Sequence, residues 1–311
     1  MICLITGGAG FIGSHLVEAL VSNGNQVRVL DNFSTGKRSN IPASLSGVEI
    51  IEGDIRDRKV VHEAMQGVSK VCHLAALVSV PESIAHPDDC FAINAQGTQI
   101  VLDEARKAGV QKVVLASSAA VYGDNTNLPL SENELSRPLS PYGLDKLYGE
   151  QLGKLYQSLY GIEVTALRFF NVFGPRQDPS SPYSGVISIF MEKMTSGKQV
   201  TIFGDGEQTR DFVYVKDVVS AITKSLQTKA DLFHLFNVGR GIQVSVNDLY
   251  RIIARQVSCD SAARYKPARD GDIVQSQADI SAISCDLGYL PEYSLEDGLI
   301  ETLDWFQHNK E

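Results

Sequence analysis

Short runs of aliphatic residues alternate with longer helical patterns through the first half of the chain. The strand-like runs span residues 2–6, 26–31, 48–52, 70–74, 112–117 and 163–169. Strands that alternate with helices in this way are typical of a parallel sheet covered by helices on both faces. The sequence therefore predicts an α/β fold built on a doubly wound parallel sheet.

The pattern changes after residue 170. Turns rich in Pro, Ser and Gly occupy 177–185, mixed short elements follow, and an amphipathic helix is expected at about 295–306. We therefore predict a first domain over 1–170 and a second, smaller α/β lobe over 171–311. Within the second part, 212–238 again has the pattern strand, helix, strand, which favours a return of the chain to the first sheet.

The charge and the cysteines exclude several classes of protein. The net charge is −9 and the longest basic run is Lys37-Arg38, so nucleic-acid binding is not expected. The 5 cysteines are an odd number without CxxC spacing, which indicates reduced thiols, and no metal site is predicted. The sequence shows neither a leader nor a long apolar stretch, so we expect a cytoplasmic protein that does not enter a membrane.

A glycine-rich loop follows the first strand and opens a helix. Gly7, Gly10 and Gly13 can turn tightly and bring a pyrophosphate to the helix amides, which include those of Phe11 and Ile12. The spacing differs from GxGxxG, and a plain turn between strand and helix is the alternative. We predict a dinucleotide site here.

The second strand ends at Asp31, which is followed by Asn32. A carboxylate at this point accepts hydrogen bonds from an adenosine ribose and repels a 2′-phosphate, so NAD is favoured over NADP. Lys37 and Arg38 leave NADP open.

Two later strand ends supply further candidates. Asp54 and Ile55 follow the third strand, where contact with the adenine is expected. His73 closes the fourth strand, and the three residues after it are expected beneath the dinucleotide: Leu74, Ala75 and Ala76. The alternatives are an Asp that caps a turn and a buried neutral His.

Tyr142 and Lys146 are four residues apart in a predicted helix and so share one face. Ionising a Tyr of pKa ~10 at pH ~7 costs roughly 4 kcal/mol. One ammonium about 4 Å away supplies about that much at an effective dielectric of ~20. The pair therefore predicts a phenolate base, with an ordinary surface helix as the alternative.

Taken together, these motifs resemble the extended short-chain dehydrogenase/reductase family, specifically the UDP-sugar 4-epimerases. The similarity covers nearly the whole chain, through segments 6–13, 73–76, 94–98, 117–123, 168–171, 204–211 and 269–272. The resemblance implies a Rossmann domain that binds NAD. It also implies that Ser118 is the catalytic Ser, that Tyr142 is the acid/base and that Lys146 holds the nicotinamide ribose.

The same resemblance implies the substrate contacts. Arg210 and Arg269 match arginines that bind the UDP phosphates, and Asn171 matches an amide that bonds the nucleotide sugar. Ser79 and Ser117 are weaker candidates for substrate contacts, and Asn94 is a weaker candidate for a cofactor contact. Surface arginines, turn residues and caps are the alternatives.

Two positions separate the chemistries within the family. Ala119-Ala120 stand where related dehydratases carry Asp-Glu, and methyl groups cannot transfer protons, so elimination is disfavoured. Ser276 matches the position that lines the C2 substituent of the sugar, and a small residue there goes with acceptance of N-acetylated sugars. Val78 replaces a Lys of the glucose-type enzymes. The alternative for Ser276 is a loop Ser without sugar contact.

We therefore expect a UDP-N-acetylhexosamine 4-epimerase that interconverts UDP-GlcNAc and UDP-GalNAc through a transient 4-keto sugar. The alternatives are a UDP-glucose or UDP-glucuronate 4-epimerase and, from another class, an inactive NAD-binding scaffold. The helix that carries Tyr142 is apolar over a wide arc, at 144, 147, 148, 152, 155, 156 and 159. With a helix at about 88–107, the resemblance implies a homodimer through a four-helix interface; extra packing within the chain is the alternative.

Overall fold

A parallel sheet of seven strands forms the centre of the described molecule. The computed structural model describes residues 1–178, 185–229, 232–259, 261–268 and 273–308. The strands of this sheet are β1 (Ile2–Thr6), β2 (Gln26–Asp31), β3 (Val48–Glu52), β4 (Val68–His73), β5 (Lys112–Ser118), β6 (Glu163–Phe169) and β11 (His234–Val238). Their order is β11-β6-β5-β4-β1-β2-β3, and every pairing is parallel. The predicted doubly wound α/β fold is confirmed.

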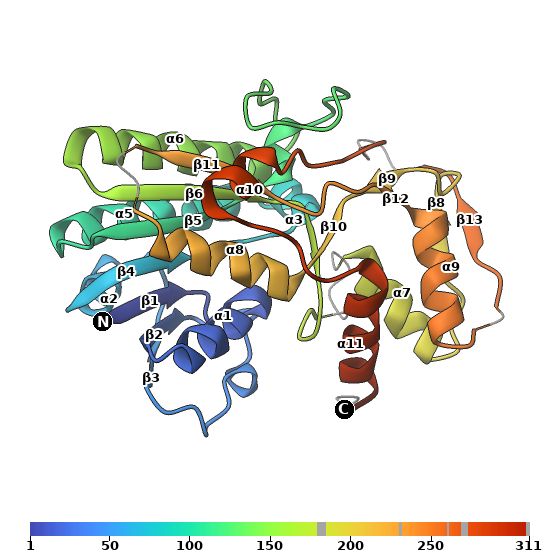
Figure 1. The fold of residues 1–311 in the computed structure, drawn as a ribbon, viewed down its shortest axis with the longest axis horizontal. Coiled ribbons are helices and arrows are strands. Elements are labelled where there is room, and N and C mark those ends of the chain that lie inside the picture. The colour runs from blue at the N-terminus through green and yellow to red at the C-terminus, as the bar shows by residue number, and fades with distance from the viewer. Residues whose placement is uncertain (179–184, 230–231, 260, 269–272, 309–311) are drawn as a thin grey trace.

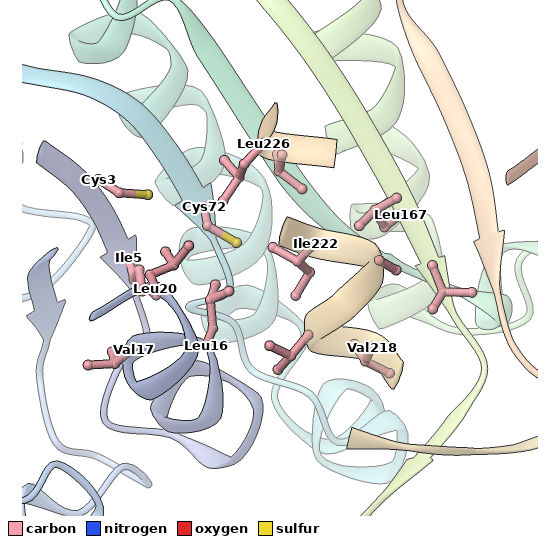
Figure 2. Packing of buried hydrophobic residues seen from close by; sticks show 14 of the residues in the cluster. Cys3, Ile5, Leu16, Val17, Leu20, Cys72, Leu167, Val218, Ile222 and Leu226 are labelled. Atoms are coloured by element: carbon pink, nitrogen blue, oxygen red, sulfur yellow. The ribbon is translucent and has the colours of Figure 1, made fainter. Parts of the chain in front are cut away.

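Helices cover both faces of this sheet (Figure 1). On one face α1 (Phe11–Ser22) packs against α8 (Val215–Gln227). Figure 2 shows the core between these helices and the strands, where Leu16, Ile222 and Cys72 are fully buried. The other face carries α2 (Arg58–Ala64), α5 (Gly97–Lys107) and α6 (Pro141–Tyr160) over a second core. Burial of apolar surface on both faces stabilises the sheet.

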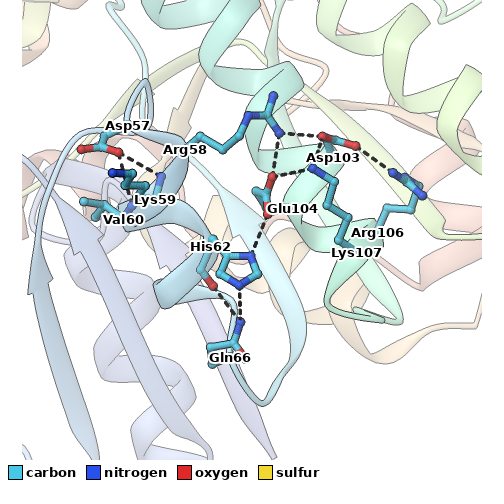
Figure 3. A network of polar contacts seen from close by, with 10 residues as sticks. All are labelled: Asp57, Arg58, Lys59, Val60, His62, Gln66, Asp103, Glu104, Arg106 and Lys107. Carbon is cyan, nitrogen blue, oxygen red and sulfur yellow. Dashed lines mark hydrogen bonds and ion pairs between the residues drawn. The ribbon is translucent and has the colours of Figure 1, made fainter.

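A polar network ties α2 to α5 (Figure 3). Arg58 donates to Asp103 and to Glu104, and Nδ1 of His62 lies 2.9 Å from Glu104. Asp57 begins α2 by accepting from the amide of Lys59. The carboxylate of Glu104 is almost fully buried, and these partners compensate its burial. The network therefore fixes the position of α5, the helix that directly follows the segment containing Asn94.

A second group of elements follows β6. It contains β7 (Asn171–Phe173) paired with β10 (Phe212–Tyr214), β9 (Thr209–Arg210) paired with β12 (Val244–Ser245), β8 (Thr201–Phe203) paired with β13 (Arg264–Lys266), and the helices α7 (Val186–Thr195), α9 (Val246–Gln256) and α11 (Leu295–His308). These elements share a separate hydrophobic core. Between β10 and β12 the chain returns to the main sheet, because β11 pairs with β6.

Short elements complete the described chain. They are η1 (Arg38–Asn40), α3 (Val80–Ala85), α4 (Pro87–Cys90), the π-helical turn η2 (Phe91–Gln96), η3 (Ala119–Tyr122) and α10 (Ser281–Leu287). Helices α4, η2 and α5 follow one another without a break. Among the described helices, none combines the length and the apolar character that crossing a membrane requires.

Candidate active site

The residues predicted to act together follow strands that are neighbours in the sheet. β1, β4 and β5 are adjacent and parallel, so their carboxyl ends meet at one edge. The glycine loop follows β1, His73 closes β4 and Ser118 closes β5. Ligands of open α/β sheets bind in the crevice outside these ends.

The glycine loop has no room for side chains at two positions. Gly7 has a φ of 71°, and a Cβ atom there would lie 2.8 Å from the backbone nitrogen of Ala75. A Cβ atom on Gly13 would lie 2.1 Å from the carbonyl oxygen of Gly7. Gly10 caps α1, and no side chain bonds the amides of this helix end, which include those of Phe11 and Ile12. This close-packed, uncapped helix start fits the pyrophosphate of a dinucleotide.

Asp31 holds the loop in place. Its side chain is 7% exposed; Oδ2 accepts from the amide of Ala9 at 2.8 Å and Oδ1 from the amide of Phe33 at 2.9 Å. The carboxylate thus stands at the end of β2 against the glycine loop, where a ribose is expected. Arg38 pairs with Glu52 at 3.2 Å, so the cation that left NADP open already has a carboxylate partner.

The third strand end is already occupied by protein partners. Asp54 accepts from Asn32 at 2.9 Å and from both Nε and Nη2 of Arg56, whose hydrogen bonds hold the pKa of this carboxyl well below its usual range. Ile55 is buried against Gly97. Both residues have structural roles, and their contact with the adenine stays a prediction.

A directed chain of hydrogen bonds runs through His73. Nδ1 lies 2.7 Å from the hydroxyl of Thr6, and Nε2 lies 3.0 Å from the hydroxyl of Thr98, which donates to the carbonyl of Asn94. Because Thr98 donates its proton to that carbonyl, Nε2 of His73 carries the hydrogen and Nδ1 accepts. Burial lowers the pKa of His73 to about 3, so the ring is neutral, as the sequence alternative held.

Asn94 completes this arrangement from the π-helical turn. Its side chain accepts from the amide of Leu77 at 2.8 Å and donates to the carbonyl of the same residue at 2.9 Å. The two bonds fix the segment after β4, which contains Leu74, Ala75 and Ala76. Ser79 lies next along the chain, where it caps α3 by accepting from the amide of Glu82.

Ser118, Tyr142 and Lys146 come together at the end of β5. Ser118 caps η3 by accepting from the amide of Ala120, and its hydroxyl lies close enough to Tyr142 to lower the pKa of that phenol. Nζ of Lys146 donates to the carbonyl of Ala116 at 2.9 Å and lies 5.8 Å from the centroid of the Tyr142 ring. Gly143 permits this approach, because a Cβ atom there would lie 2.8 Å from the carbonyl oxygen of Ala120.

The expected depression of the Tyr142 pKa by Lys146 alone is wrong. Burial raises the pKa of Tyr142, and the bond from Ser118 opposes that rise only in part. Burial also lowers the pKa of Lys146 to about 8. The phenol is nearly enclosed, at 9% exposure, and its desolvation is the largest influence on its pKa. In the protein alone Tyr142 is therefore a neutral phenol.

Ser117 points into a different environment from Ser118. Its hydroxyl donates to the buried carboxylate of Glu150, which forms a two-point ion pair with Arg168 at 2.8 Å for each bond. The guanidinium of Arg168 lies 4.6 Å from the ring centroid of Tyr122. The sequence analysis missed Glu150, although it lies four residues after Lys146 on the same helix. Ser117 supports this buried pair, and we assign the sugar contact to Ser118.

The predicted UDP contacts lie on the second group of elements. Asn171 lies at the start of β7 with its side chain exposed. Its backbone amide donates to the backbone carbonyl of Asp211 at 3.0 Å. Arg210 lies on β9 and donates to the carbonyl of Thr209 at 2.8 Å. Arg269 lies outside the described residues.

Asp211 is a residue that the sequence analysis did not single out. Its fully buried carboxylate accepts from the amides of Arg240, Gly241 and Ala278 at 2.8 to 3.0 Å. These bonds hold the segment that carries Ser276 beside the Arg210 strand. The sequence signal for Asp211 was its position beside Arg210 at the end of segment 204–211, which resembles the family.

Ser276 faces inward on this segment. It is 6% exposed and lies two residues before Ala278, so in an extended chain both side chains point the same way. Leu130 bonds the backbone on both sides of Ala278, through Gln277 and Asp279, at 2.8 Å each. Ser276 is thus a small side chain on a firmly held piece of backbone.

Comparison with known proteins identifies relatives along the full length. The family model described as NAD dependent epimerase/dehydratase family matches residues 3–239. A UDP-glucose 4-epimerase of Mycolicibacterium smegmatis is 36% identical over 99% of both chains. The solved UDP-glucose 4-epimerase of Thermotoga maritima, with UDP-glucose, is 38% identical at a TM-score of 0.95 over 100% of both chains. The UDP-N-acetylglucosamine 4-epimerase of Methanobrevibacter ruminantium, in complex with UDP-N-acetylmuramic acid, is also 38% identical at 0.95, over 99% of this chain and 98% of that one.

Proposed function

The chain belongs to the NAD dependent epimerase/dehydratase family, and from that premise we propose that it interconverts UDP-GlcNAc and UDP-GalNAc by inverting C4 of the sugar. At the coarser level it is an NAD-dependent UDP-sugar 4-epimerase. The glycine loop from Gly7 to Gly13, Asp31 and Lys146 would hold NAD. When bound, NAD would supply the hydride acceptor for C4 and, in its reduced form, the hydride donor.

The side chains at the end of β5 supply the proton transfers. Once Tyr142 has lost its own proton, it can take the proton of the sugar 4-OH and return it when the 4-keto sugar is reduced, while Ser118 bonds the same oxygen. The hydroxyl of Ser118 already lies beside the phenol at a strand end, so the two groups can converge on one oxygen. Ala119 and Ala120 offer no carboxylate for elimination, which leaves epimerisation as the outcome.

Binding of the nucleotide is assigned to the second group of elements. Arg210 and Asn171 would hold the UDP group, with Arg269 as a further predicted contact. In this proposal the sugar itself is held loosely and turns about its phosphate linkage, so that either face can meet the cofactor. Tyr142 lies on α6, which packs on the main sheet, and Arg210 lies on β9 in the second group of elements, which suits a substrate that is anchored at one end and reacts at the other.

The observation that carries the N-acetyl preference is the small, inward-facing Ser276. Its backbone is held through Ala278 by Asp211 and by the bridge to Leu130, so a larger residue could not swing away. A pocket excludes a substituent by filling the space that the substituent needs. With Ser at this position, we infer that the space beside C2 admits an acetamido group.

A second candidate is a 4-epimerase of UDP-glucose. It is favoured by the Thermotoga maritima enzyme, which is as similar to this chain as the UDP-N-acetylglucosamine 4-epimerase is. Purified protein should be given UDP-GlcNAc and UDP-glucose in separate assays, and kcat/KM compared. A higher value for UDP-GlcNAc supports the proposal; a far higher value for UDP-glucose contradicts it. Absence of turnover on either sugar would favour the scaffold alternative.

We also propose a homodimer formed through α6, in a protein that works in the cytoplasm. Apolar side chains that the described chain leaves exposed gather on neighbouring elements: Ile84 at 62%, Phe91 at 49%, Leu144 at 57%, Leu155 at 50% and Leu159 at 61%. They lie on α3, η2 and α6, which pack against one another. An apolar surface of this kind marks an association site.

A further inference from the structure

Asp145 lies beside Lys146 on α6, and the proposed mechanism gives it no role. Its side chain is 6% exposed, and among the described residues its Oδ2 atom has no hydrogen-bond partner. A buried carboxylate is costly unless charges or hydrogen bonds compensate it. An Asp in this position therefore calls for an explanation in terms of its surroundings.

Among the charged and titratable groups around Asp145, all but one are neutral or already paired with each other. From β4, His73 is neutral, and from α4, Cys90 keeps its proton because burial raises the pKa of this thiol to about 12. Tyr142 is a neutral phenol. Glu150 on α6 and Arg168 on β6 compensate each other. Within the described part of the chain, the charge that remains on this face is the ammonium of Lys146.

Asp145 and Lys146 line one cavity although they are consecutive in a helix. Neighbouring helical residues point about 100° apart. Asp145 and Lys146 nevertheless both line a cavity of about 10 Å³, together with Asn94, His73 and Thr98. This space has room for about one water molecule. The thiol of Cys90 lies close enough to Asp145 to influence its pKa, and the side-chain amide of Asn94 donates to the Cys90 sulfur at 3.3 Å.

We propose that Asp145 is a positioning residue for the epimerase reaction, whose buried carboxylate keeps Lys146 an ammonium ion on the Ala116 carbonyl, beside Tyr142. This inference rests on the proposed role of Lys146. Burial works against the ammonium form, since it favours release of the proton, and negative charge on Cys90 or on Asp145 would oppose that effect. Because Cys90 keeps its proton, this role falls to Asp145. If Lys146 were neutral, Tyr142 would lose the charge that favours its ionised form during proton transfer.

The first test measures Lys146 directly and needs no turnover. Protein labelled with [13C]lysine is titrated by NMR without nucleotide, and the Lys146 resonance is identified by its absence from Lys146→Arg. Asp145→Asn, which keeps the shape and removes the charge, should lower the pKa of Lys146 by about one unit. Asp145→Ser repeats the measurement with a side chain that leaves room for water. An unchanged pKa in both variants overturns the proposal, whatever the substrate of the enzyme is.

The second test uses the pH profile of kcat. In Asp145→Asn the alkaline limb should move down by about one pH unit, with kcat about fivefold lower near pH 8 and KM changed by less than about twofold. Asp145→Glu keeps the charge and should keep the alkaline limb of the wild type. A uniform loss of kcat at every pH, or a shifted limb in Asp145→Glu, would instead assign Asp145 a packing role and overturn the proposal.

Discussion

Nζ of Lys146 lies 5.8 Å from the centroid of the Tyr142 ring, while its hydrogen bond goes to the backbone of β5. The cation is therefore placed by the sheet and not by the phenol. No hydrogen bond joins the two side chains, and burial is the largest influence on the pKa values of both groups. In the protein alone Tyr142 is therefore a phenol that can donate a proton. It can act as a base only after its pKa has been lowered enough for it to lose that proton.

Tyr142→Phe removes the hydroxyl and keeps the buried ring. We expect kcat to fall by about 10³-fold or more, because the acid/base group is lost. Binding of UDP and of NAD, measured by calorimetry, should stay within about threefold of the wild type, since those contacts lie elsewhere. A variant with substantial turnover would remove Tyr142 from its proposed role.

Ser276→Tyr fills the space that the proposal gives to the acetamido group. We expect kcat/KM for UDP-GlcNAc to fall by about 100-fold and that for UDP-glucose by less than about threefold. The readout is the ratio of the two values. Ser276→Ala is the matched control, because it stays small and should leave the ratio unchanged. Equal losses on both sugars in Ser276→Tyr would contradict a specific role and indicate damage to the fold.

Gly13→Ala places a methyl carbon where the carbonyl of Gly7 already lies, at 2.1 Å. The glycine loop must then move, so we expect weaker NAD binding by at least about tenfold and a lower melting temperature. Gly10→Ala is the graded control, because its Cβ atom would lie 3.2 Å from the same oxygen. Binding measured by fluorescence quenching should rank wild type above Gly10→Ala and Gly10→Ala above Gly13→Ala. The reverse order would show that crowding at Gly7 does not shape the site.

The buried, neutral His73 should make the stability of the folded protein depend on pH. Its pKa is lowered by burial from 6.5 to about 3, so between these values the unfolded chain binds one more proton than the folded protein. Stability is then fully present above pH ~6.5 and is lost as the pH falls toward ~3, by an amount on the order of a few kcal/mol. Urea unfolding of His73→Gln, which can both donate and accept, should show a shallower decrease over this range. An identical slope in the two proteins would mean that other groups carry the acid sensitivity.

Sequence reasoning found the sheet, the glycine loop and the pair Tyr142 and Lys146, because these features depend on local spacing, whereas Ser118 came from the family resemblance. The predicted strand at 70–74 begins at Val68 and ends at His73, a shift that spacing alone does not fix. The reasoning missed Glu150 and Asp211, whose partners lie far away in the sequence. It also gave Tyr142 the wrong direction of pKa shift, because the packing that buries this residue comes from other elements and does not show in helical spacing.

The proposed dimer gives the last prediction. Leu155 is 50% exposed in the middle of α6, on the side of the sheet away from α1 and α8. Leu155→Glu would bury an uncompensated charge in a dimer formed through this helix, so sedimentation at micromolar concentration should change from dimer to monomer. Leu290→Glu is the matched control: Leu290 is 69% exposed and follows Tyr289, which belongs to the core of the opposite face. A wild type that sediments as a monomer, or a Leu290→Glu variant that dissociates while Leu155→Glu does not, would contradict an interface on α6.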